Sequence, residues 1–480
     1  MGLKERLIRK DKYVWELPAG TIEGQKVPVI LYLSEVLFQK LEEDAIRQAA
    51  NAATLPGVEK AIYVMPDVHV GYGFPVGGVM ATNAETGIIS PGSIGYDINC
   101  GVRLIATNLK AVDIAPRIRE IMNEILKNVP AGVGSTSEIK LSKSQMKEVL
   151  VRGAGWAIDY GFGFPEDLQH IESFGALPNA DPDKASKEAY ERGSDELGTV
   201  GSGNHFIEIQ AVEEIYEPDV AEKIGIWEGQ IVIMVHSGSR GFGHQVCTDY
   251  LRIALKARDK YKIKLPDPQL ACMPFKSEEG QSYFKAMNAA ANYAFANRQI
   301  LGFKTANTLR KFLGISWEEF GYRLIYDHAH NIGKIEKHKV NGKEVEVVVH
   351  RKGATRAFPP MNKEVPPSYR EVGQPVIIPG DMGRASFLLV GQPNSMEMSF
   401  GTACHGAGRV MSRRQAKKFV REVGFEKVIG NLVVVARGKG TIMEEIPQAY
   451  KDVTEVVKVI GELKIAKAVA KLKPLGTLKG

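Results

Sequence analysis

The sequence predicts a mixed α+β fold, with central sheets that carry the active-site loops and with helices at the periphery. Short apolar runs of strand length end in glycine-rich polar loops, and longer stretches between them have apolar residues at helical spacing. Polar loops with chemically reactive residues occur from residue 65 to the last few residues, so a site built from them needs both ends of the chain. We therefore expect a single large catalytic domain over residues 1–480.

The predicted strands are short runs rich in valine and isoleucine, at residues 62–64, 231–235, 376–378 and 432–435. Such runs are typical of strands that are buried on both faces, and the polar loop after each run would lie at one edge of a sheet. Asn341-Gly342, between two valine-containing segments, predicts a β-hairpin, because Asn-Gly favours the tight turn that joins antiparallel strands.

Helices are predicted where apolar residues recur every three or four positions. Residues 279–313 are rich in Ala, Asn, Phe and Leu and are predicted to be mainly helical, within a mostly helical inserted region at about residues 245–320. A second amphipathic stripe runs from Val453 to Leu463. A third follows Ser34, a plausible N-cap, and consists of Leu37, Leu41, Ala45 and Ala49.

Composition excludes several classes of protein. The chain has 44% hydrophobic and 25% charged residues, as expected for a globular protein with a large core. No apolar run approaches the roughly 20 residues that span a bilayer, and the charged N-terminal segment does not resemble a secretory signal, so we expect a cytoplasmic location. The four cysteines form no disulfide framework, and a net charge of +6 permits a nucleic-acid partner without requiring one.

Five residues in polar loops or at strand ends are candidate metal ligands: Asp97, Cys100, His205, His236 and His330. Thiolate, imidazole and carboxylate groups all bind borderline divalent metals, and zinc is the metal that they favour. Because five ligands exceed what one tetrahedral ion needs, two ions that share Cys100 would use them better. Spacing alone does not bring the histidines together, and each could instead be a hydrogen-bonded loop residue.

The segment from His405 to Arg409 has the composition of a phosphate-binding loop. Gly406, Ala407 and Gly408 allow backbone amides to approach an anion, and Arg409 adds a planar set of donors. His405 beside such a loop is a candidate nucleophile toward phosphorus, and a histidine that only donates a hydrogen bond is the alternative.

A second tight loop, residues 379–383 with Ser386, follows a predicted strand, and a plain turn is its alternative interpretation. Neither a P-loop nor a Rossmann pattern is present, so nucleotide binding would use another design. Residues 409–421 contain six basic residues and no acidic one, and Val410, Phe419 and Val420 could anchor them as an amphipathic helix. Such a helix face is usually only solvated, but this run begins inside the phosphate loop, which favours a polyanionic substrate.

Eight segments, taken together and in this order, resemble the RtcB family of RNA-splicing ligases, and the resemblance spans nearly the whole chain. The matching runs are MPDVHVGYGFPVGG (65–78), GSIGYDINCGVR (92–103), GSGNHFIEIQ (201–210), VHSGSRGFG (235–243), AHN (329–331), HRKGATRA (350–357), IPGDMG (378–383) and CHGAGR (404–409). Members of the family often carry serine where this chain has Asp381, so the second loop departs from the family pattern.

The resemblance implies two manganese ions and GTP as co-substrate. Asp97, Cys100 and His205 would hold one ion, and Cys100, His236 and His330 the other, while His405 would attack the α-phosphate of GTP. Arg192, Arg240, Lys352 and Arg409 could meet RNA phosphates. The guanine nucleotide would contact Asn204, His205, Phe206, Ile207, Glu208, His330, Asn331, Pro379, Gly380, Asp381, Met382, Ser386, His405, Gly406, Ala407, Gly408, Tyr450 and Lys479.

The implied reaction joins RNA with a 2′,3′-cyclic phosphate or 3′-phosphate to RNA with a 5′-hydroxyl, through a histidine–guanylate and a guanylylated 3′ end. The RNA would be tRNA exon halves or broken RNA, and an activating protein of the archease type is a possible partner. Two alternatives remain. One is a metal-dependent phosphoesterase that opens cyclic phosphates, in which the nucleophilic histidine would be surplus. The other is a non-catalytic RNA-binding repair scaffold, which needs no buried Cys–His cluster.

Overall fold

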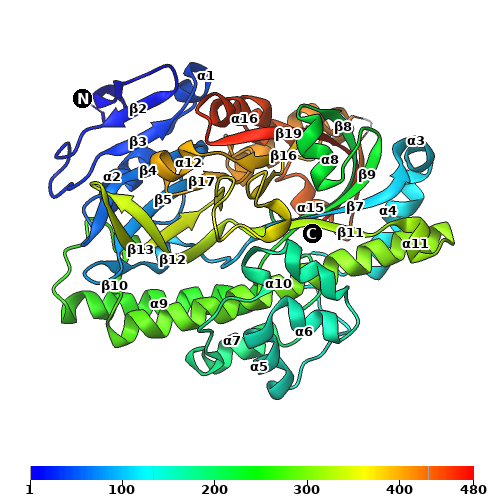
Figure 1. The fold of residues 1–480 in the computed structure, drawn as a ribbon, viewed down its shortest axis with the longest axis horizontal. Helices are drawn as coiled ribbons and strands as arrows, with labels where there is room; N and C mark the ends of the chain where they lie inside the picture. The colour runs from blue at the N-terminus through cyan, green and yellow to red at the C-terminus, as the bar shows by residue number, and fades with distance from the viewer. Residues whose placement is uncertain (1, 133, 431) are drawn as a thin grey trace.

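The computed structural model describes residues 2–132, 134–430 and 432–480. It confirms the mixed α+β class: the described residues form two large, mainly antiparallel sheets with helices around them (Figure 1). The first sheet has the order β1 (Ile8–Arg9), β2 (Val14–Leu17), β3 (Val29–Tyr32), β4 (Val58–His69), β5 (Val76–Asn83), β13 (Lys343–Lys352) and β12 (Asn331–Val340).

The second sheet supplies most of the strand ends that matter for function. Its order is β11 (Arg323–Ala329), β7 (Gly101–Lys110), β9 (Gln230–Ser237), β8 (Phe206–Ile215), β19 (Ala466–Lys479), β16 (Ser386–Gly391) and β15 (Pro375–Ile378), and β18 (Val433–Ala436) pairs with β19 in parallel. The runs predicted as strands are confirmed in β4, β9 and β15, and the fourth in β18, which begins one residue later, at Val433.

The two sheets meet where the chain passes directly from one to the other. β11 of the second sheet ends at Ala329, and β12 of the first begins at Asn331, so His330 lies at the junction. The predicted β12–β13 hairpin is confirmed, with Val340 paired to Lys343. Its turn residues Asn341 and Gly342 both have positive φ, 50° and 79°, as the tight turn between two twisted strands requires.

One group of helices lies along one side of the sheets (Figure 1). α10 (Glu278–Leu313) confirms the predicted helix, and it begins where the Ser277 hydroxyl accepts a hydrogen bond from the Gly280 amide. α10 packs against β9, which contains His236, and against β7, which begins directly after Cys100. With α9 (Arg240–Lys260), it occupies most of the region expected to be an insertion, and that description of the region stays a prediction. The neighbouring helices are α4 (Ile118–Asn128), α5 (Lys143–Arg152), α6 (Ala154–Asp159) and α7 (Lys187–Gly193).

Two helix predictions need correction, and α16 (Val453–Glu462) confirms a third. The stripe after Ser34 forms two helices, α1 (Glu35–Gln39) and α2 (Glu43–Ala52), because the chain turns out of the helical conformation at Glu42 (φ −82°, ψ 135°). Ser34 does cap α1, as predicted.

The basic segment becomes helical only in α13 (Arg413–Val423). Ser412 and Gln415 form a capping box that fixes the start of this helix. The preceding residues pair with other parts of the chain instead, since the Val410 amide donates to the Ala449 carbonyl at 2.7 Å. Val410 is 39% exposed, so it does not anchor the helix, whereas Val420 is buried.

Candidate active site

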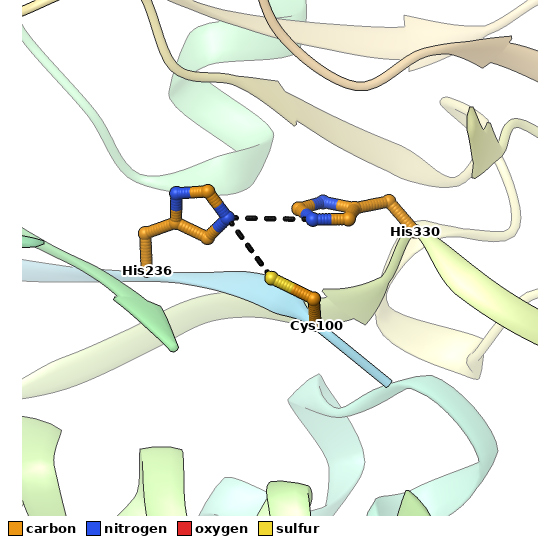
Figure 2. Close-up of side chains that lie close together, drawn as sticks. All are labelled: Cys100, His236 and His330. Carbon is orange, nitrogen blue, oxygen red and sulfur yellow. Dashed lines mark hydrogen bonds between the residues drawn. The ribbon is translucent and has the colours of Figure 1, made fainter. Parts of the chain in front are cut away.

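The five candidate metal ligands converge on one point, although four segments of the chain carry them. Among the described residues, Asp97, Cys100 and His205 form one group of closely spaced ligand atoms. Cys100, His236 and His330 form the other, so Cys100 belongs to both (Figure 2). Residue type suggested two groups of ligands that share Cys100, but spacing could not show that the side chains meet. In the structure the side chains have this arrangement.

The distances fit a metal ion. In a tetrahedral site with bonds of about 2.0–2.3 Å, neighbouring ligand atoms lie about 3.3–3.8 Å apart. Cys100 Sγ lies 3.4 Å from His205 Nε2 and 3.3 Å from His236 Nε2, and His236 Nε2 lies 3.3 Å from His330 Nε2. Asp97 Oδ2 and His205 Nε2 are closer, at 2.8 Å, so this pair would separate slightly around an ion.

Strand pairing explains why these side chains meet. In the second sheet, Val102 pairs with His236, which also pairs with Phe206, so Cys100, His205 and His236 lie at the same end of β7, β8 and β9. Gly238 leaves room for the Asp97 carboxylate, because a Cβ atom at this position would overlap it.

Arg298 of α10 connects three segments that carry ligands. Its Nη1 donates to the Asn99 carbonyl at 2.6 Å and to the Ser237 carbonyl at 3.0 Å, beside Cys100 and His236. Its Nη2 lies 2.8 Å from Asp327 Oδ1 in β11. The guanidinium is fully buried, so α10 holds the ligand loops at fixed positions.

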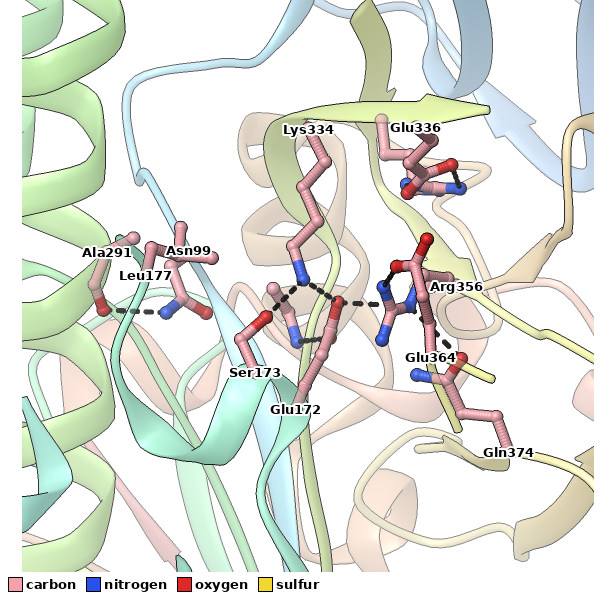
Figure 3. A network of polar contacts seen from close by, with 12 residues as sticks. Asn99, Glu172, Ser173, Leu177, Ala291, Lys334, Glu336, Arg356, Glu364 and Gln374 are labelled. Carbon is pink, nitrogen blue, oxygen red and sulfur yellow. Dashed lines mark hydrogen bonds and ion pairs between the residues drawn. The ribbon is translucent and has the colours of Figure 1, made fainter. Parts of the chain in front are cut away.

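A second buried network supports the strand that leads to His330. Figure 3 shows Glu172 between Lys334 and Arg356. Its carboxylate lies 2.5 Å from the Lys334 ammonium and accepts a hydrogen bond from the Ala329 amide at 2.9 Å. Burial raises the pKa of Glu172, but Lys334, Arg356 and the Ala329 amide together lower it by more, so the pKa is about 2. The network therefore keeps a charged carboxylate beside the backbone that carries His330.

Burial keeps the imidazoles of the cluster in the form that binds a metal. Burial holds the pKa values of His236 and His330 well below the usual range, so both imidazoles are neutral, as metal ligands must be. Burial and the nearby Asp97 carboxylate raise the pKa of the Cys100 thiol well above its usual value. A cation between these groups would reverse that effect, because it stabilises the thiolate.

His405 directly follows β17 (Thr402–Cys404) and contacts a buried carboxylate. Its Nδ1 lies 2.5 Å from Asp67 Oδ2, and the same oxygen accepts the amides of His405 (3.0 Å) and Gly406 (3.2 Å). Burial raises the pKa of Asp67, but His405 lowers it more, so the carboxylate stays charged. Asp67 thus orients the imidazole through Nδ1 and leaves Nε2 available. The His405 and His330 ring centroids are 4.9 Å apart, so the candidate nucleophile adjoins the metal cluster.

The loop after His405 is shaped by close backbone packing. Gly408 has a φ of 76°, and a Cβ atom there would overlap the Asp67 carbonyl, so the position requires glycine. Lys451 is buried beneath this loop, and its ammonium donates to the carbonyls of Pro66 and Val68 on either side of Asp67.

One pocket unites the metal cluster, His405 and both candidate phosphate loops. Besides Asp97, Cys100 and His236, the predicted residues that line it are Asn204, Phe206, Glu208, His330, Asn331, Lys352, Pro379, Gly380, Asp381, Met382, His405, Gly406, Ala407, Gly408, Arg409, Tyr450 and Lys479. Glu208 accepts hydrogen bonds from Thr477 and Gln210, and burial raises its pKa to about 7. Asp381 is almost fully buried, and burial raises its pKa to about 6 even though Arg384 lies 3.3 Å away.

Some predicted contact residues do not line the pocket. Ile207 is fully buried in the core, and Ser386 lies behind the second loop, where its hydroxyl accepts the Gly380 amide at 3.2 Å. Arg192 and Arg240 bond instead to Gln245 and Thr199.

The other two candidate RNA contacts line the pocket but already have protein partners. Lys352 donates to the carbonyls of Tyr72 and Gly92, at 2.6 and 2.9 Å. Arg409 pairs with Glu445 at 2.9 Å.

Several polar residues of the site carried no assigned role in the sequence, among them Asp67, Arg298 and Glu445. Asp67 stands between apolar neighbours in the run 65–78, which is the signal that could have identified a buried carboxylate. Arg298 had no comparable signal, because its partners are backbone carbonyls far away in the chain. Among the described residues, no helix combines the length and apolar character needed to cross a bilayer.

Comparison with known proteins identifies the family of the chain. The model of the family described as tRNA-splicing ligase RtcB matches residues 48–480. A protein named tRNA-splicing ligase RtcB from Archaeoglobus fulgidus is 50% identical over 482 residues and covers 100% of both chains. Proteins with the same name from Thermococcus kodakarensis and Methanococcus maripaludis are 49% and 47% identical, covering 99% and 100% of each chain. The chain therefore belongs to the tRNA-splicing ligase RtcB family.

Proposed function

We propose that this protein is an RNA ligase that uses GTP and manganese. It would join RNA ending in a 2′,3′-cyclic phosphate or 3′-phosphate to RNA that begins with a 5′-hydroxyl. The observation that carries the proposal is His405, which contacts buried Asp67 and adjoins the two ligand groups within one pocket. The names of the relatives support RNA, and tRNA in particular, as the substrate.

His405 acts as the nucleophile in this scheme. With Nδ1 held by Asp67, the lone pair on Nε2 attacks the α-phosphorus of GTP, and the bond from that phosphorus to the bridging oxygen breaks, so pyrophosphate leaves. The charged Asp67 stabilises the positive charge that develops on the ring. The imidazole then carries guanylate as a phosphoramidate, which is reactive enough to pass it on.

The second half of the reaction activates the RNA end. A cyclic phosphate is first hydrolysed to a 3′-phosphate, and an oxygen of that phosphate attacks the guanylate phosphorus, which releases His405. The 5′-hydroxyl of the other RNA then attacks the activated 3′-phosphorus, loses its proton and displaces GMP. Two metal ions held through Cys100 would neutralise charge on the attacking and leaving oxygens.

The protein groups around the nucleotide would hold it in place. Phe206 presents an aromatic ring to the pocket, and Glu208 and Lys479 place polar groups beside it. The amides of residues 405–408 are suited to phosphate oxygens, because glycine allows them to approach closely. The proposed reaction is compatible with an activating protein of the archease type, and with RNA repair as well as tRNA splicing.

A ligation assay tests the proposal. RNA halves with a 2′,3′-cyclic phosphate and a 5′-hydroxyl are incubated with the protein and Mn²⁺, with GTP, with ATP or without nucleotide. We expect joined RNA with GTP only, and none from the His405→Ala variant, while His170→Ala, outside the pocket, retains activity. Opening of the cyclic phosphate without joining would identify a phosphoesterase. Tight RNA binding with neither reaction would identify a scaffold. Either result would refute ligation.

A further inference from the structure

α13 carries a concentration of positive charge that the reaction described above does not use. The chain has 62 basic and 56 acidic residues, an excess of six. Residues 409–421 contain six basic residues and no acidic one, so the rest of the chain is balanced. Five of the six lie on α13, whose one acidic residue is Glu422, so this short helix carries a net charge of +4 (5 − 1) out of the +6 of the whole chain.

The basic side chains of α13 line a surface groove that is open to solvent. Arg414, Lys418 and Arg421 are exposed, and among the described residues neither Arg414 nor Arg421 forms an ion pair. Glu444 neutralises part of the charge through Lys417, at 2.5 Å, and through Arg413, at 3.4 Å. The groove is lined by Arg413, Arg414, Gln415, Lys417, Lys418, Arg421 and Glu444.

The groove adjoins the active-site pocket, because Arg413 lines both. Arg413 and Arg421 are eight residues apart, and a helix rises 1.5 Å per residue, so the basic stripe runs about 12 Å along the helix from the residue that borders the pocket. A strand whose end lies beside His405 could therefore continue along this helix.

α13 holds its charges on a fixed support. Its start is defined by the Ser412–Gln415 capping box. Its inner face buries Ala416 and Val420 in a small apolar cluster with Val428, Ile446 and Ala449. Because the helix is packed on one face and basic on the other, the charges are arranged before any partner binds.

We propose that the exposed face of α13 binds the phosphate backbone of the substrate RNA beyond the nucleotides that enter the pocket. This inference rests on the proposed ligase function. A polyanionic strand fits the site because the basic residues recur along one helix, next to the pocket that would receive the end of the strand. Each phosphate neutralised releases counterions, so this contact is strongly dependent on salt.

The test compares Arg414→Gln/Lys418→Gln/Arg421→Gln with a matched control, Arg252→Gln/Lys256→Gln/Lys264→Gln. The control removes the same charge from exposed positions on and after α9 that do not line the pocket. Binding of two RNAs with 3′-phosphates, 20 and 3 nucleotides long, is measured by fluorescence anisotropy at several salt concentrations. GTP is omitted, and circular dichroism checks that each variant is folded.

For the α13 variant, we expect the affinity for the 20-nucleotide RNA to fall roughly tenfold, and the slope of log K against log salt to decrease by about 2, for three lost contacts to a single strand. The 3-nucleotide RNA should bind as to the wild type. Unchanged affinity and slope with the longer RNA would overturn the proposal and would favour an acidic protein as the occupant of this surface. Equal losses in the control variant would also overturn it. Wild-type RNA binding without ligation would refute the ligase function alone.

Discussion

Replacing Arg298 with methionine tests whether α10 holds the metal centre in shape. The buried guanidinium donates to the carbonyls of Asn99 and Ser237, which adjoin Cys100 and His236. Methionine fills similar space but donates no hydrogen bond. The two carbonyls would lose a donor, and the chain segments that carry two ligands would lose their common support.

The magnitude follows from these contacts. A buried acceptor left without a partner costs about 1–3 kcal/mol, and a broken buried ion pair about 3–5 kcal/mol. Asp327 keeps Arg103, at 2.8 Å, so little of the ion-pair cost applies. The two carbonyls lose about 2 kcal/mol each, so we expect a total of about 4 kcal/mol. Loss of residues that orient metal ligands lowers metal affinity about 10–100-fold, and we expect a loss of that size for Mn²⁺.

Arg103→Met is the matched control. Arg103 is also fully buried and pairs with Asp327, but its other hydrogen bond goes to the Gln299 side chain, away from the ligand loops. Urea unfolding should show comparable destabilisation of both variants, whereas calorimetric titration with Mn²⁺ should show a large affinity loss only for Arg298→Met. Wild-type Mn²⁺ affinity in Arg298→Met, or equal losses in the two variants, would refute this role.

Three further predictions follow from charged groups near the site. Asp67→Asn should slow guanylate transfer to His405 about 100-fold or more, in single-turnover labelling, with metal content unchanged; an unchanged rate would exclude the orienting role. Because the pKa of Asp381 is raised to about 6, its carboxylate becomes charged as pH rises through 6 and repels the triphosphate. GTP binding should therefore weaken between pH 5 and 7.5 more in the wild type than in Asp381→Asn, and identical profiles would contradict this reasoning. Burial raises the pKa of Glu172, but Lys334 and the other groups around it lower it by more, to about 2. The charged carboxylate therefore contributes to stability above pH 4.5, and this contribution is lost as pH falls toward 2. The wild type should lose about 3 kcal/mol of unfolding free energy over that range relative to Glu172→Gln, and parallel curves in urea unfolding would argue against it.

Local features of the fold could be predicted because neighbouring residues determine them. The hairpin at Asn341-Gly342 and the long helix α10 follow from turn preference and apolar spacing. The break between α1 and α2 could not be predicted from spacing, since the apolar stripe continues across it. α13 starts late because the residues before it pair with Ala449 instead of continuing the helix. That pairing depends on a segment far away in the chain, so local sequence does not indicate it.

The candidate site likewise has features that the sequence indicated and features that only the fold reveals. Residue types indicated the candidate ligands, but only the pairing of β7, β8 and β9 brings Cys100, His205 and His236 together. The resemblance places Asp381 at the nucleotide, and the structure does show it lining the pocket, but it is almost fully buried and paired with Arg384, which no sequence pattern indicated. Contacts to backbone carbonyls, such as those of Arg298, have no sequence pattern, so no motif could have indicated them.

Labelled nucleotide shows whether His405 carries guanylate. The protein is incubated with Mn²⁺ and GTP labelled at the α-phosphate, and covalently bound label is measured after denaturation. We expect label that is lost in acid and stable in alkali, as for a phosphoramidate on histidine. His405→Ala should abolish it while metal content stays near the wild-type value, and His170→Ala should label normally. Undiminished label on His405→Ala would contradict the account.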